Sequence, residues 1–236
     1  MTNPFEAPSS RGASATGHLD VMKALTDGWE ATQRNWLTWL GVGLVGMICV
    51  LVAELLCFLP VLVVGPAISW GFTRFAFDAL DGEGKFETLF AGFDRLGEIV
   101  PPFLIGGLAL AAGMIGLYIP FLIVFGVLGA IGSDTLMLVV GLPTSLVFAA
   151  VILFLSMRVG FWAHVIVDRK LGGVEAITES WRITEGKVLP LLGLALATVA
   201  VALVGYVACI IGIFPAMMIV TGAQASAYRQ LAGRSA

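Results

Sequence analysis

Long uncharged stretches alternate with short polar ones along most of this chain. Apolar sequence runs from Leu37 to about Ala79, from Ile99 to Gly132, from Leu136 to Val167 and from Val188 to about Ala223. A helix needs roughly 20 apolar residues to cross a hydrocarbon core of ~30 Å, so every run exceeds one span. We therefore predict an all-α membrane protein of about six transmembrane helices arranged as three hairpins, within a range of five to eight.

Prolines and glycines indicate where these runs turn. The first hairpin is predicted to turn near Pro60 and the last near Gly212 to Pro215, because proline and glycine interrupt helices. In the middle of the chain, the two apolar runs are each longer than one span requires, and Pro120 and Pro143 flank the extra residues. We expect kinks or interfacial pieces between residues 121 and 142.

The polar segment before each hairpin carries an apolar stripe with a period near 3.6, which is typical of amphipathic helices. The stripes consist of Val21, Met22, Leu25, Trp29 and Trp36; of Phe86, Leu89, Phe90, Phe93 and Leu96; and of Val174, Ile177, Trp181 and Val188. Helices of this kind lie in the membrane interface with the polar face toward water. An amphipathic elbow helix is therefore predicted before each hairpin.

Two parts of the chain resemble each other. Residues 24–41 align with 176–193 at an offset of 152. The identical pairs are Ala24/Ala176, Thr26/Thr178, Trp29/Trp181, Thr32/Thr184, Leu37/Leu189, Leu40/Leu192 and Gly41/Gly193. We predict an internal repeat of 24–80 and 176–230 in which both copies start on the same side. Such a parallel repeat differs from the inverted repeats common in transporters, which makes a transporter the less favoured interpretation.

Charge predicts the orientation. All 13 Lys and Arg residues fall in the tails, the two polar segments or the adjoining membrane ends. Because an excess of Lys and Arg on one side of the membrane marks the cytoplasmic side, both termini are expected there. Five tryptophans are predicted to lie near the same face: Trp29, Trp36, Trp39, Trp162 and Trp181. We expect a disordered cytoplasmic tail at 1–18, a single polytopic membrane domain at 19–230 and a second cytoplasmic tail at 231–236.

Composition supports this picture and excludes another class of protein. Hydrophobic residues make up 58% of the chain and charged residues 12%, whereas a soluble domain has about 25% charged residues. The net charge of −3 argues against nucleic-acid binding, which needs clustered Lys and Arg.

Short motifs suggest a family. They are Gly65-Pro66, Gly84-Lys85-Phe86, Leu89-Phe90, Gly92-Phe93, Asp168-Arg169, Ala176, Ser180-Trp181 and Gly186-Lys187. With them, the chain resembles uncharacterised bacterial polytopic inner-membrane proteins related to the membrane domain of glycerophosphodiester phosphodiesterases. That resemblance implies the fold and the bacterial inner (cytoplasmic) membrane as location. It implies no catalytic residues, because the family carries none that are known.

Charged residues near or inside the apolar runs are the candidate site residues, because charge in a bilayer is costly. Glu54 could be a coupling carboxylate, or it could simply reach the outer headgroups. Arg74 and Arg158 are expected to extend toward the phosphates, and Arg74 could also pair with Asp78 one turn later. The sharper hypothesis is that Arg74, Arg158 and His164 together contact a lipid phosphate.

No catalytic, metal-binding or cofactor-binding set is predicted from the sequence. The histidines, His18 and His164, are too isolated for a metal site. The glycines from Gly41 to Gly46 match a dinucleotide-binding pattern but lie in a predicted membrane helix, where small residues serve packing. We expect a non-enzymatic membrane protein that organises lipid or accompanies a membrane complex, with lipids, other membrane proteins or a second copy as partners. The alternative is a carrier or channel for a small or amphipathic molecule.

Overall fold

The computed structural model describes residues 18–55, 58–207 and 209–233, and every regular element within these ranges is a helix. The predicted all-α class is therefore confirmed for this part of the chain. Of the two predicted tails, residues 1–17 and 234–236 lie outside the described residues.

Five helical stretches of the described part are long and apolar enough to cross a membrane, which is compatible with a multi-pass membrane protein. They comprise Trp36–Leu55 (α2), Pro60–Leu80 within α3 (Phe58–Leu80), Phe86–Ile131, Asp134–Arg169 and Val188–Val207 (α9). The final helix, α10 (Cys209–Leu231), is equally long but less apolar toward its C-terminus.

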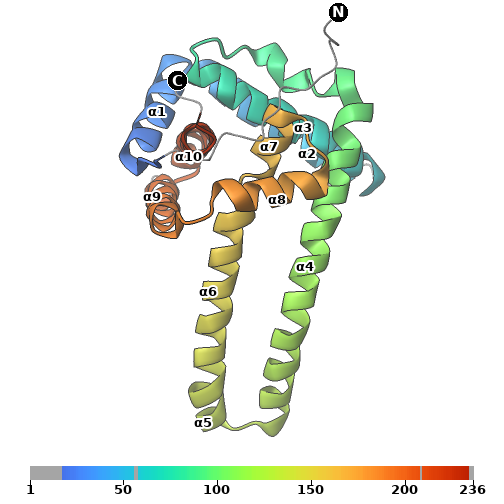
Figure 1. The fold of residues 1–236 in the computed structure, drawn as a ribbon, viewed down its shortest axis with the longest axis vertical. Coiled ribbons are helices and arrows are strands. Elements are labelled where there is room, and N and C mark those ends of the chain that lie inside the picture. Colours follow the sequence, from blue (N-terminus) through green and yellow to red (C-terminus); the bar gives the residue numbers. More distant parts are fainter. Residues whose placement is uncertain (1–17, 56–57, 208, 234–236) are drawn as a thin grey trace, which may run out of the picture.

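The middle hairpin projects from the rest of the molecule as two adjacent helices (Figure 1). Its first arm is α4 (Leu96–Ile131), a helix of 36 residues that continues past Pro120. The chain reverses through α5 (Asp134–Leu136) and a π-helical turn, η3 (Met137–Gly141), into α6 (Leu142–Val159). The predicted irregularity is thus confined to the end of the range 121–142. Pro143 lies in the first turn of α6, where proline leaves no hydrogen bond unmade.

The helix boundaries on either side of the middle hairpin differ from the prediction. Helix α2 ends at Leu55 and α3 begins at Phe58, so Pro60 lies in the first helical turn, where proline leaves no hydrogen bond unmade. Likewise α9 ends at Val207 and α10 begins at Cys209. The predicted turn at Gly212 to Pro215 is therefore wrong, because these residues lie inside α10.

Two of the three predicted amphipathic helices are present, as α1 (Val21–Arg34) and α8 (Gly173–Ile183). The third is wrong as an α-helix, since the segment forms two short 3₁₀ helices, η1 (Phe86–Phe90) and η2 (Phe93–Arg95). Its backbone lies directly on α3, where a Cβ on Gly71 would come within 2.0 Å of the Leu89 carbonyl oxygen. Contact with α3 therefore determines its shape more than helical periodicity does.

Glycines also seat the two amphipathic α-helices against their neighbours. Helix α1 packs along α10, and a Cβ on Gly28 would come within 2.5 Å of the Ala223 nitrogen. Helix α8 crosses the base of the α4–α6 hairpin (Figure 1), and a Cβ on Gly173 would come within 2.1 Å of the Pro102 carbonyl oxygen. Docking of α1 on α10 brings the two ends of the described chain together.

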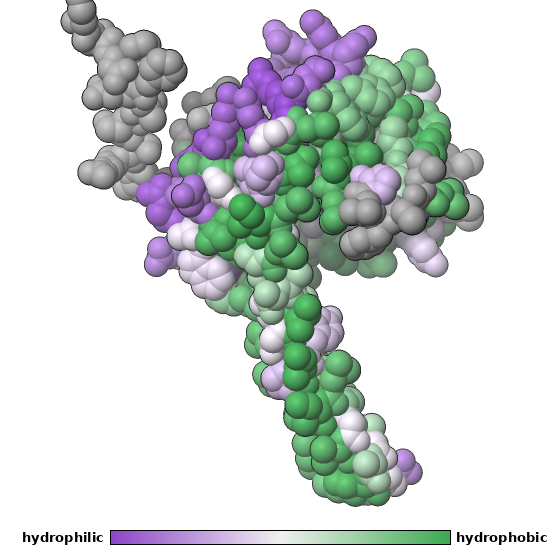
Figure 2. Space-filling model, turned by 90° about the vertical axis from the view of Figure 1, so that its right-hand side faces the viewer, coloured by the Kyte–Doolittle hydropathy of each residue, from purple (hydrophilic) through white to green (hydrophobic). Residues whose placement is uncertain are grey.

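The long helices do not share one direction. Helices α4 and α6 run along the long axis of the molecule, whereas Figure 1 shows α9 and α10 nearly end-on. Hydrophilic residues gather at the end opposite the hairpin tip, and most of the hairpin surface is apolar (Figure 2). This polar end carries the start of α4 and the end of α3.

The tryptophans of the predicted belt differ in burial, and their common face stays a prediction. Trp29, Trp36 and Trp181 are exposed. Trp39 is fully buried, and its indole nitrogen donates to the Ala31 carbonyl oxygen at 3.2 Å. Trp39 therefore joins α2 to α1 and does not anchor the chain at an interface.

Two pairs of residues aligned in the predicted repeat are buried alike. Ala24 and Ala176 are both fully buried. Thr32 and Thr184 are both buried, and each hydroxyl donates to the carbonyl oxygen four residues earlier, at 2.8 and 2.7 Å. The packing partners differ, because α1 packs on α10 whereas α8 packs mainly on α4 and α7. The repeat itself stays a prediction.

Candidate functional site

His164, one of the predicted lipid contacts, lies in α7 (Trp162–Arg169) and is enclosed by aromatic rings. The edges of Phe77 and Phe161 approach it with centroid distances of 5.8 Å, and Tyr228 stacks on it at 5.7 Å. The imidazole is buried, and its Nδ1 has no hydrogen-bond partner among the described residues. We call this meeting point of α3, α7 and α10 the junction. It leaves no opening for a phosphate at His164.

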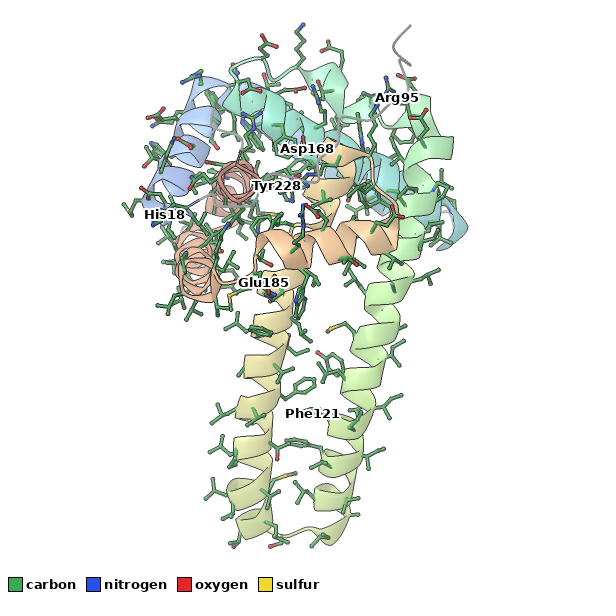
Figure 3. All side chains as sticks on the ribbon, viewed as in Figure 1. His18, Arg95, Phe121, Asp168, Glu185 and Tyr228 are labelled. Carbon is green, nitrogen blue, oxygen red and sulfur yellow. The ribbon has the colours of Figure 1, made fainter. Side chains whose placement is uncertain are left out.

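Polar contacts hold the rim of the junction. The Tyr228 hydroxyl donates to Asp168 at 2.8 Å, joining α10 to α7 (Figure 3). Arg229 donates two hydrogen bonds to the Asp81 carboxylate, at 2.6 and 2.7 Å, and one to the Phe77 carbonyl oxygen at 3.0 Å. The hydrogen bonds from Arg229 lower the pKa of Asp81 below its ordinary value. These contacts fix α10 against its neighbours.

Arg158 lies in the last turn of α6 and is 6% exposed. Its guanidinium stacks over the Trp181 ring at 4.4 Å, an arrangement that stabilises a cation by the ring's quadrupole. The Arg158 carbonyl oxygen accepts from the hydroxyls of Ser180 at 2.9 Å and Thr184 at 3.3 Å. Arg158 therefore ties α6 to α8, and its Nε has no partner among the described residues.

The remaining predicted site residues lie apart from these two. Arg74 pairs with Asp78 at 3.0 Å, which confirms the i, i+4 interaction, and its side chain is half-exposed. Glu54 is exposed in the last turn of α2. Within the described ranges, no hydrogen bond, ion pair or ring contact joins any two of Arg74, Arg158 and His164. A phosphate contact shared by the three residues stays a prediction.

A further charged cluster was not anticipated from the sequence. Glu179 of α8 accepts a hydrogen bond from Arg169 of α7. It also accepts from two nitrogens of Arg182, both at 2.8 Å. The hydrogen bonds and the negative charge of Glu179 raise the pKa of Arg182. The cluster holds α7 against α8. Among the described residues, no group of three or more His, Cys, Asp or Glu side chains could hold a metal ion.

Cavities lie between the helices, and three of them bear on the site. One, of about 590 Å³, is a groove between α1, α9 and α10 with an almost wholly apolar lining. A cavity of about 470 Å³ lies between α3, α7 and the start of α4 and carries charged side chains. A third, of about 210 Å³, lies between α6, α9 and α10 and contains Ser156, Thr198 and Gln224. None of the three is lined by Glu54, Arg74, Arg158 or His164.

One comparison with known proteins finds a relationship. A family model described as "Domain of unknown function (DUF7847)" matches residues 92–235, from the approach to α4 through α10. No curated protein and no solved structure matches the chain. The family description contains no activity and no link to phosphodiesterase membrane domains, so that resemblance stays a prediction.

Proposed function

The chain belongs to the DUF7847 family, and from its geometry we propose that it is a non-enzymatic membrane protein that binds phospholipid. In this proposal it resides in the bacterial inner membrane with both termini cytoplasmic. It organises lipid by itself or as the accessory subunit of a membrane complex.

The middle hairpin supports residence in a bilayer. Only 6% of the positions in the most apolar window of each arm are buried by protein. Large exposed side chains such as Leu108, Leu122 and Leu146 cover its surface. Monomeric soluble proteins rarely expose contiguous apolar patches of more than a few hundred Å², so hydrocarbon is the medium that suits this surface.

The groove between α1, α9 and α10 is the observation that carries lipid binding. Its lining comes from Leu25 and Trp29 of α1, from Val201 and Val204 of α9 and from Ile219 of α10, among others. Thr26 supplies a hydroxyl, but that group donates to the Met22 carbonyl oxygen at 2.8 Å within α1. Such a lining suits an acyl chain and offers little to a polar solute.

The test is native mass spectrometry of the protein extracted in lipid particles without delipidation. Lipid should remain bound, and Val201→Trp, which fills the groove, should reduce the bound lipid. Val199→Trp is the matched control, because Val199 is exposed on the same helix and does not line the groove. Equal lipid binding by both variants would contradict the groove as the site. A stoichiometric protein companion would support the accessory role.

The finer topology in this proposal is six spans as three hairpins. Reporters placed after Asp134 and after Val207 should then both face the outer side, and a reporter after Gly233 should face the cytoplasm. Because α9 and α10 do not run parallel to α4 and α6, the reporter after Val207 is the decisive one. A cytoplasmic signal there would contradict six spans and leave the middle hairpin as the crossing element.

A carrier for a small molecule is the second candidate, favoured by the cavity of about 210 Å³. Ser156, Thr198 and Gln224 give this cavity polar groups from three helices. Glu54 would supply the coupling carboxylate. Uptake that depends on a proton gradient and is lost in Glu54→Gln and Gln224→Leu would support the carrier, and unchanged uptake in both variants would count against it.

A further inference from the structure

The cavity of about 470 Å³ combines charged and apolar walls. It lies where α3, η2 with the start of α4, and the end of α7 meet. Trp70, Ile99, Pro102, Ile166 and Leu171 form its apolar part. Arg95, Glu98 and Lys170 form its charged part.

The three charged side chains are available to a ligand. All three are exposed, and within the described ranges none forms a salt bridge or a side-chain hydrogen bond. Arg95 and Glu98 are three residues apart at the start of α4, a spacing at which ion pairs form readily, yet they do not pair. Lys170 ends α7 in the left-handed conformation, with φ of 53°.

The cavity also lies at the border between the polar end and the apolar body. Arg95 projects near the polar end of α4 in Figure 3. Ile99 and Pro102 follow it one and two turns along the same helix, toward the apolar hairpin. A ligand that fits both walls must therefore be charged at one end and apolar at the other.

We propose that this cavity binds the headgroup of a zwitterionic phospholipid with a primary amine, of the phosphatidylethanolamine type. Arg95 and Lys170 bind the phosphate, and Glu98 accepts hydrogen bonds from the ammonium. The glycerol end and the first acyl carbons lie against Trp70 and Pro102. The inference deepens the proposed lipid function by naming a headgroup class and a second site, apart from the groove.

Charge arithmetic favours this class over an anionic lipid. The two cations, Arg95 and Lys170, match the phosphate, and the Glu98 carboxylate matches the ammonium of the same molecule. Glu98 then faces no second negative charge. In an anionic headgroup without an amine, Glu98 would face the phosphate with nothing to bind. Hydrogen bonds between ionised partners are about twice as strong as neutral ones, so each should matter for affinity.

The test uses the purified full chain in nanodiscs of phosphatidylcholine. Phosphatidylethanolamine or phosphatidylglycerol is added, and bound lipid is counted by native mass spectrometry. The unaltered protein should prefer phosphatidylethanolamine. Arg95→Gln with Lys170→Gln should weaken binding of both added lipids at least about tenfold, the loss expected for a charged hydrogen bond. Glu98→Gln should weaken phosphatidylethanolamine alone and abolish the preference.

Controls separate this site from simple surface charge and from the groove. Arg34→Gln removes an exposed arginine outside the cavity, paired only with Glu30 at 4.0 Å, and should leave binding unchanged. Phosphoethanolamine, which has the headgroup chemistry without chains, should not displace the lipid at equal concentration. Displacement would assign the site to a soluble phosphate compound and overturn the lipid assignment.

Comparison with the groove variant makes failure of the two proposals distinguishable. If Val201→Trp loses lipid while the Arg95 and Lys170 variant keeps its lipid and its preference, the headgroup site is wrong and the proposed function stands. If neither variant loses lipid, both proposals are wrong.

Discussion

The middle hairpin and the junction show opposite relations between apolarity and burial. The arms of the hairpin are among the most apolar of the five spans, yet only 6% of the positions in the most apolar stretch of each arm are buried. Helix α3 forms one wall of the junction. It is the least apolar of the five spans, and 39% of the positions in its most apolar stretch are buried.

In a water-soluble protein the most apolar helices would be the most buried, because burial removes apolar surface from water. The reversed order is what a lipid solvent permits, since a helix there can expose leucine without penalty. Helices in lipid associate instead through close packing and polar contacts. The junction has both, in its stacked rings and in the hydrogen bonds of Tyr228 and Arg229.

The largest effect should come from placing charge on the hairpin. Ile123 is 60% exposed in α4, so Ile123→Arg would be harmless if the hairpin lay in water. In a bilayer, arginine at the centre of a span costs about 2.5–3.5 kcal/mol or more. We expect loss of membrane-inserted protein in Ile123→Arg, measured by carbonate extraction, and normal insertion in Ile123→Leu. Full insertion of the arginine variant would break the comparison.

Next in size are the close approaches between helices. A Cβ at Gly106 would come within 2.7 Å of the Trp162 ring, whereas at Gly107, on another face of α4, nothing lies within 4 Å. Overpacking of this kind costs about 1–3 kcal/mol. Gly106→Ala should lower the thermal midpoint in detergent by several degrees, and Gly107→Ala should leave it nearly unchanged. Equal midpoints would mean that α4 does not pack on α7 as described.

Sequence periodicity was sufficient to predict the helical class, the long apolar stretches and the amphipathic helices α1 and α8. These features follow from local pattern, which the chain carries residue by residue. Turn positions were less predictable, because Pro60 is compatible with the first turn of a helix as well as with a loop.

Contacts between distant segments could not be predicted. The sequence does not distinguish Gly28 from Gly43, yet of the two only Gly28 lies against the backbone of another helix. Arg95 and Lys170 are 75 positions apart and share a cavity only because α4 and α7 converge. Arg74, Arg158 and His164 were grouped by expected depth. Depth does not specify which partner a side chain finds: Arg74 pairs with Asp78, Arg158 stacks on Trp181, and His164 packs among aromatic rings.

An effect of comparable size should distinguish two tyrosines. Tyr228 is buried in the junction and donates to Asp168, whereas Tyr118 is exposed on the hairpin. Tyr228→Phe removes one hydrogen bond to a carboxylate and should cost about 1–3 kcal/mol of unfolding free energy. Tyr118→Phe should cost almost nothing. Denaturation in mixed micelles would measure both, and a larger loss in Tyr118→Phe would contradict the assignment of specific contacts to the junction.

The smallest effect should be the pH dependence carried by Asp81. Hydrogen bonds from Arg229 lower its pKa in the folded protein below the ordinary value of 3.8. The pair therefore stabilises fully above that ordinary value, and the contribution is lost as the pH falls through the lowered pKa. Because the Asp81 side chain is 50% exposed, the contribution should stay below about 1 kcal/mol.

Thermal midpoints between pH 6 and pH 2.5 should fall less steeply in Asp81→Asn than in the unaltered protein. Glu30→Gln, which removes an exposed pair at 4.0 Å, should keep the original slope. If Asp81→Asn keeps that slope too, acid sensitivity originates outside the rim of the junction, and the contrast with the hairpin rests on packing alone.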